Sequence, residues 1–145
     1  MGKWDKLDGY LHLCERQNAG DFNVGVGQAL SALRKGYSTV FKDNISYLRL
    51  DVAKSLTNSS ASSLQSCHDS ILRLHALEEM ESISNTGDAG ETVYSGVRSS
   101  LERRLDILGG CLADKQYLLG LRRALMELSY VLSFFFFFFL FMAIQ

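Results

Sequence analysis

SSLQSCHDSILRLHALEEMESIS, residues 62–84, is the longest uninterrupted helical pattern in the chain. Its apolar residues recur at i, i+3 and i+7 along one face, and a second apolar stripe lies well round the same cylinder. The first stripe comprises Leu64, Cys67, Ile71, Leu74 and Leu77, and the second comprises Leu72, Ala76, Met80 and Ile83. A helix with two apolar faces needs neighbours on two sides, so we expect a central helix in a stacked array.

Polar residues mark the two ends of this stretch. Ser62 and Gln65 have the spacing of a capping box, in which two otherwise unpaired backbone amides are satisfied at the start of a helix. Glu78, Glu79 and Glu81 lie near the other end, and we interpret them as a solvated acidic face.

Helical patterns flank the stretch on both sides. They predict further helices over 3–14, 22–35, 37–55, 92–108 and 114–129. The apolar stripe over 37–55 is Tyr37, Phe41, Ile45, Leu48 and Val52, and the stripe over 114–129 is Leu118, Leu121/Arg122, Leu125 and Leu128. Gly36 is expected at the C′ position after one of them, and Asp114 is expected to cap the last. Polar residues 57–63 and a flexible linker over 85–91 separate the patterns.

The order of these elements predicts an all-α fold. The spacing Trp4-x-x-Leu7-x-x-Tyr10 approximates the start of a tetratricopeptide-like (TPR-like) hairpin. We therefore expect antiparallel helical hairpins, a fragment of a TPR-like α-solenoid, followed by a hydrophobic C-terminal helix or tail.

Composition supports this fold class and limits the function. The 145 residues include no proline, which favours helices, and the net charge of −1 gives no electrostatic argument for nucleic-acid binding. Three widely spaced cysteines, Cys14, Cys67 and Cys111, are interpreted as reduced core residues of an intracellular protein.

No pattern of reactive residues points to an enzyme. His68 and His75 are seven residues apart, a poor spacing for a shared metal, and Gly25-Val26-Gly27 lacks the third glycine of a dinucleotide fingerprint. We interpret the two glycines as allowing close helix packing. Arg103-Arg104 and Arg122-Arg123 have the pattern of a contact to an acidic partner or a phosphate, but we favour the interpretation of surface residues paired with Glu102 or Glu127. We therefore predict no catalytic, cofactor-binding or metal-binding residue.

Four segments resemble, in the same order, the FAT region of the phosphatidylinositol-kinase-related protein kinases. They are Gly2-Lys3-Trp4-Asp5-Lys6-Leu7, Gly27-Gln28-Ala29-Leu30, Ile71-Leu72-Arg73-Leu74-His75-Ala76-Leu77-Glu78-Glu79-Met80-Glu81 and Leu118-Leu119-Gly120-Leu121-Arg122-Arg123-Ala124-Leu125. The third is similar to the family's V-R-L-H-x-L-x-E-L-E stretch, and the fourth to its I-L-x-L-R-R-A-L helix end. The strongest likeness is to the ATR-type checkpoint kinases, and it covers residues 2–129.

The resemblance implies a non-catalytic slice of an α-solenoid that supports a kinase domain and contacts partner proteins through its helical faces. The family phosphorylates Ser or Thr followed by Gln in the nuclear response to DNA damage. This chain departs from the family because it has no kinase domain and only a small part of the FAT region. The resemblance therefore implies a nuclear scaffold fragment that is catalytically inactive by itself, with no direct contact to nucleic acid.

The composition changes abruptly at residues 130–145, which include six consecutive phenylalanines and no charge. One interpretation is a membrane anchor over 130–144, although fifteen residues rise only about 22 Å against a hydrocarbon core of ~30 Å. The other, which we favour, is translated intron, since Ser129-Tyr130-Val131 can be encoded with a GTATGT splice donor. The alternative function is therefore a small tail-anchored membrane protein with a helical interaction domain.

Overall fold

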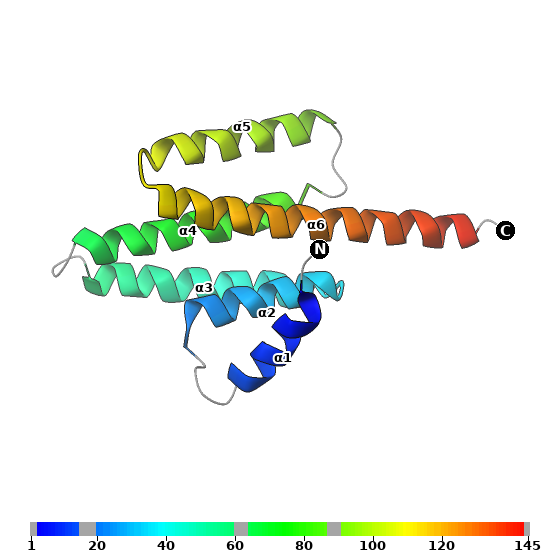
Figure 1. Cartoon of the computed structure of the whole chain (residues 1–145), viewed down its shortest axis with the longest axis horizontal. Coiled ribbons are helices and arrows are strands. Elements are labelled where there is room, and N and C mark those ends of the chain that lie inside the picture. Colours follow the sequence, from blue (N-terminus) through cyan, green and yellow to red (C-terminus); the bar gives the residue numbers. More distant parts are fainter. Residues whose placement is uncertain (1–2, 15–19, 60–63, 87–90, 144–145) are drawn as a thin grey trace. The chain divides into compact units, whose positions relative to one another are not determined.

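The computed structural model describes residues 3–14, 20–59, 64–86 and 91–143, without the side chains of 59, 91–94 and 130–143. Figure 1 shows helices joined by short connections. The helices are α1 (Trp4–Cys14), α2 (Phe22–Arg34), α3 (Ser38–Ser59), α4 (Leu64–Ser84), α5 (Glu91–Ile107) and α6 (Leu112–Ala143). The described residues contain no strand, which confirms the all-α prediction.

The chain forms two compact units, residues 1–77 and 78–145, whose boundary lies within α4. The first unit contains α1, α2, α3 and most of α4, and the second contains the end of α4 with α5 and α6. Each unit has its own buried apolar residues and is described separately.

In the first unit, α2 packs against α3 on one side and α1 on the other. The predicted stripe of α3 is buried from Phe41 to Val52, but Tyr37 at its start is 59% exposed. Helix α1 contributes Leu11 and Cys14 to a cluster with Val24. The buried apolar residues of α2 and α3 are Phe22, Val24, Val26, Ala29, Leu30, Ala32, Leu33, Phe41, Ile45, Leu48 and Val52. This burial is the main source of stability for the hairpin.

Two glycines let α2 approach both neighbours closely. A Cβ atom on Gly25 would lie 2.5 Å from Cδ2 of Leu48, and one on Gly27 would lie 3.1 Å from Cδ2 of Leu11. The interpretation of these glycines as helix-packing residues is therefore confirmed.

Capping residues define the ends of α2. The Asp21 side chain accepts a hydrogen bond from the Asn23 amide at 2.7 Å. At the other end Gly36 has φ +78°, its amide donates to the Leu33 carbonyl, and the Tyr37 amide donates to the Ala32 carbonyl. These two bonds form a Schellman motif, which places Gly36 at C′ as predicted.

Helix α4 differs from its prediction at its N-terminal half. Leu64 is 93% exposed and Ile71 is exposed, whereas Ala76, Leu77 and Met80 are fully buried. The first predicted stripe is thus wrong over this half, because periodicity identifies residues that share a face but not the face that a neighbour covers. The capping box cannot be assessed, since Ser62 lies outside the described residues.

Other helix boundaries also differ from their predicted positions. Helix α3 continues to Ser59, beyond the predicted end at residue 55. Helix α6 begins at Leu112, so Asp114 lies in its first turn, where a carboxylate still favours the helix dipole, instead of capping it. Of the predicted linker, Asn85 and Thr86 form a turn, 87–90 lie outside the described residues, and Glu91 starts α5.

The second unit buries residues from all three of its helices. Leu101 of α5 is buried, and the stripe of α6 is buried as predicted. The buried apolar residues are Met80, Ile83, Leu101, Leu118, Leu121, Leu125 and Leu128. The backbone of α6 is helical as far as Ala143. The side chains of 130–145 lie outside the described residues, so neither the membrane anchor nor the translated intron is tested. Among the side chains that are described, no helix is both long and apolar enough to cross a membrane.

Candidate functional site

A buried ion pair lies in the second unit. Glu79 of α4 is 0% exposed, and its carboxylate accepts two hydrogen bonds from Arg122 of α6. The Arg122 Nη2 to Glu79 Oε1 distance is 2.8 Å, and the Nε to Oε2 distance is 3.3 Å. Nη2 also donates to the Leu101 carbonyl of α5 at 3.1 Å. One guanidinium therefore joins all three helices of the unit.

This arrangement corrects two sequence-based interpretations. Glu79 is not part of a solvated face, and Arg122 is not a surface residue paired with a neighbour on its own helix. Both side chains share a stripe with buried apolar residues: Glu79 with Ala76 and Ile83, and Arg122 with Leu118 and Leu125. The spacing of Arg122 from those leucines was the available signal.

Of the neighbouring charges, Arg123 follows its interpretation. It pairs with Glu127 at 3.6 Å within α6, as expected of a helix-surface pair, and such an exposed pair contributes little to stability. Arg104 does not follow its interpretation, because its side chain is only 16% exposed and contacts Glu78 of α4 at 3.6 Å.

Chemically, the buried pair is suited to holding helices together. An arginine guanidinium does not release its proton, and the Glu79 oxygens are both occupied by it. The pair therefore provides neither a general base nor a nucleophile. Its geometry instead makes the packing of α4, α5 and α6 specific, because only one arrangement satisfies every partner.

A second polar cluster joins α1 to α2 in the first unit. The Asp8 carboxylate accepts a hydrogen bond from the Ser31 hydroxyl at 2.7 Å and contacts Lys35 Nζ at 3.5 Å. The Ser31 hydrogen bond, with help from the Lys35 and Arg34 charges, lowers the pKa of Asp8 below its ordinary value against an opposing effect of burial. The cluster is another helix-to-helix contact.

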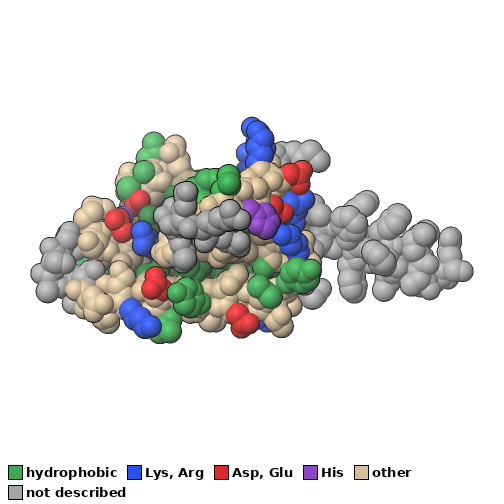
Figure 2. Space-filling view, turned by 90° about the horizontal axis from the view of Figure 1, so that it is seen from below, with side chains coloured by type: hydrophobic (Ala, Val, Ile, Leu, Met, Phe, Trp, Pro, Cys, Tyr) green, Lys and Arg blue, Asp and Glu red, His purple; other side chains and the backbone are tan. Residues whose placement is uncertain are grey.

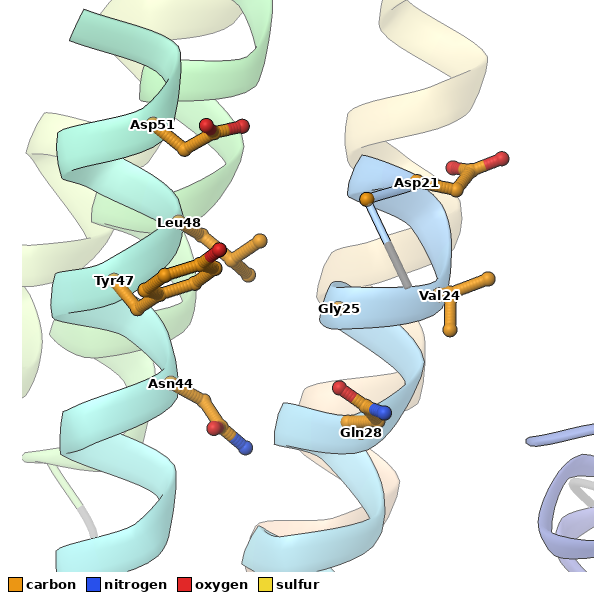
Figure 3. Close-up of a pocket in the computed structure, with 9 residues that line it drawn as sticks. Asp21, Val24, Gly25, Gln28, Asn44, Tyr47, Leu48 and Asp51 are labelled. Atoms are coloured by element: carbon orange, nitrogen blue, oxygen red, sulfur yellow. The ribbon is translucent and has the colours of Figure 1, made fainter. Parts of the chain in front are cut away.

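The first unit also contains a hollow between α2 and α3, shown in Figure 3. Its volume is about 100 Å³. The lining residues are Gly20, Asp21, Val24, Gly25, Gln28, Asn44, Tyr47, Leu48 and Asp51. A neighbouring depression of about 410 Å³ shares Gln28 and Asn44 with it and is also lined by Asp8 and His12 of α1 and by Lys35, so the two form one groove. We call it the α2–α3 groove.

Apolar side chains remain exposed on the outer faces of the first unit. Figure 2 shows apolar surface at several places on one face of the molecule. The large exposed apolar residues of α1 and of the α3 region are Tyr10, Leu13, Tyr37, Val40, Tyr47 and Leu50. Several lie on helices whose opposite faces are buried, which is typical of helices that pack against further protein.

The side chains considered as possible ligands are dispersed. His12 and His68 are exposed, and no group of three potential metal ligands occurs among the residues that were described. All three cysteines are free thiols, but only Cys14 is buried, while Cys111 is exposed just before α6. The prediction of a core position is therefore wrong for Cys111, which occupies a connection instead of a helical stripe.

Comparison with known proteins gives one match. The family model described as FAT domain matches residues 1–132. No curated protein sequence is significantly similar to the chain, and no solved structure is either.

Proposed function

We infer the function of this chain from the family to which it belongs, the FAT domain family. FAT domains are non-catalytic helical segments of proteins related to the phosphatidylinositol-kinase-related kinases. The chain is therefore a helical scaffold segment, and the all-α architecture of its described residues agrees with this role.

We propose more specifically that it is a segment of an ATR-type serine/threonine kinase that acts in the nuclear DNA-damage checkpoint. The ordered set of motifs over residues 2–129 supports this narrower assignment, above all the segments at 71–81 and 118–125. In the parent protein the segment supports the kinase domain and offers its outer helical faces to partner proteins.

One structural observation carries the scaffold role. The buried charged side chains of Glu79 and Arg122 bind each other and hold three helices together. At the same time exposed apolar residues such as Tyr37 and Val40 point to faces that are covered in a larger assembly. Buried polar groups that hold helices together, combined with exposed apolar residues on the outer faces, are the features of a scaffold.

A domain graft tests the assignment. Residues 1–129 would replace the matching segment of an ATR-type kinase and, as a control, of another kinase of the same wider family. We expect phosphorylation of a Ser-Gln peptide to be retained in the first graft and lost in the second. Loss of activity in both grafts, with both proteins soluble and of native size, would contradict the ATR-type assignment.

The genomic sequence beyond the codon for Ser129 supplies an independent test. We expect a splice acceptor followed by an in-frame continuation that encodes further helical repeats and a kinase domain. An open reading frame that reaches its stop codon directly after residue 145, supported by transcripts, would contradict the intron interpretation.

A further inference from the structure

The α2–α3 groove has the features of a binding site for a positively charged side chain. Gly25 and Leu48 line it where α2 and α3 approach each other closely. Tyr47 forms a wall and is 67% exposed, so its ring is available to a ligand. Figure 3 shows that Asn44, Tyr47 and Asp51 project from α3 toward α2, with Gln28 on the opposite side.

The charges at this end of the groove are of one sign. The hollow at this end is lined by Asp21 and Asp51 and by no lysine, arginine or histidine, whereas His12 and Lys35 line the other end of the groove. No cation of the described residues lies within ion-pair distance of the Asp51 carboxylate. Asp21 is engaged as the cap of α2, so Asp51 is the carboxylate available to a ligand.

These groups match the chemistry of arginine. A guanidinium can stack on an aromatic ring while it donates hydrogen bonds to a carboxylate and to amide oxygens. Tyr47, Asp51 and the Asn44 amide lie on one stripe of α3 and supply these three kinds of contact. A phosphate-bearing ligand, in contrast, would be repelled by the carboxylates.

The rest of the groove indicates which kind of ligand would contain the arginine. Val40 continues the same stripe of α3, Tyr37 lies in line with it directly before the helix begins, and both are exposed apolar residues. From Tyr37 to Asp51 the stripe is about 21 Å long at 1.5 Å per residue. That length suits an amphipathic helix of roughly fourteen residues, with apolar side chains against Tyr37 and Val40.

We propose that the α2–α3 groove binds an amphipathic helix of a partner protein whose arginine enters the hollow beside Tyr47 and Asp51. The proposal rests on the inferred scaffold role and names the chemistry of one partner. It extends that role from a general helical contact to a site with a defined electrostatic requirement.

A synthetic peptide tests the proposal with the full chain. The probe is a fluorescent helical peptide of roughly fourteen residues, with leucines on one face and an arginine in its last turn, where a cation favours the helix dipole. A second peptide carries citrulline, a neutral analogue of arginine, at the same position. We expect the arginine peptide to bind about fivefold more tightly by fluorescence anisotropy, the effect of one exposed cation–π and charge contact.

Variants of the protein identify the group that recognises arginine. Asp51→Asn should remove the preference for arginine, whereas Asp43→Asn, an exposed carboxylate of α3 outside the groove lining, should keep it. Tyr47→Leu should reduce the preference about threefold while keeping the apolar contact. Equal binding of the two peptides, preserved preference in Asp51→Asn, or no binding of the arginine peptide at about 1 mM would each overturn the proposal. The kinase grafts measure phosphorylation and the peptides measure binding, so the ATR-type assignment and the groove proposal can each fail without the other.

Discussion

Replacing Arg122 by alanine removes the guanidinium that joins α4, α5 and α6. The Glu79 carboxylate would lose both of its hydrogen bonds, and the Leu101 carbonyl would lose its bond from α6. Since Glu79 is fully buried, water cannot replace these partners without opening the packing of the unit. We expect the free energy of unfolding to fall by about 3–5 kcal/mol, the usual result of leaving a buried charge uncompensated.

The paired replacement separates the charge from the packing. A Glu79→Leu and Arg122→Met double variant removes both charges and keeps apolar volume at each position. Buried ion pairs that are replaced in this way often leave stability unchanged or raise it by about 1–4 kcal/mol. We therefore expect the double variant to be more stable than Arg122→Ala by at least about 3 kcal/mol.

Urea unfolding followed by circular dichroism at 222 nm measures these differences. Trp4 fluorescence reports on residues 1–77, the unit that does not contain Arg122, and should shift less than the circular dichroism signal. Arg123→Ala is the matched control, because Arg123 is exposed and its pair with Glu127 contributes under about 1 kcal/mol.

Two results would refute this reasoning. One is a loss of less than about 1 kcal/mol in Arg122→Ala, since a buried carboxylate that loses the arginine paired with it is destabilised by more than that. The other is a double variant as unstable as the single one, which would show that the shape of the two side chains matters and their charge does not.

Three further predictions concern the first unit. Gly25→Ala should lower the free energy of unfolding by about 1–2 kcal/mol, because its Cβ would overlap Leu48. In a Leu48→Ala background, thermal unfolding should show that the same change is neutral or stabilising. Gly36→Ala should cost about 1 kcal/mol, because Gly36 has φ +78°, and should lower the melting temperature. Because the pKa of Asp8 is lowered in the folded state, its stabilising effect is present above the unfolded pKa and lost as pH falls through the folded pKa. Urea unfolding should therefore show that the advantage of the native chain over Asp8→Asn shrinks as the pH is lowered through the acidic range, and an advantage that grows there would contradict this.

Local patterns predicted the features of the fold that depend on neighbouring residues. In α3, the period of Phe41, Ile45, Leu48 and Val52 identified the buried face, because residues three to four apart must share a side of a helix. The position of Gly36 after α2 was predictable for a similar reason, since a left-handed C′ residue favours glycine strongly.

The features that join distant residues were not predictable in this way. Glu79 and Arg122 are separated by 43 positions, and nothing local to either residue specifies the other. A glutamate between two other acidic residues also has the pattern of a solvated face, and only the packing of α6 shows otherwise. The α2–α3 groove was missed because Gln28 and Asp51 belong to different helices.

The bond from Arg122 to Leu101 ends on a main-chain oxygen, which every amino acid possesses. Evolution can therefore exchange the side chain at 101 for another apolar one without affecting this bond. Positions 79 and 122 have no such freedom, because a change at one leaves the other as a buried charge without its partner. Among related sequences the two should covary, as an acidic–basic couple or as two uncharged residues, and a mismatched couple should be rare.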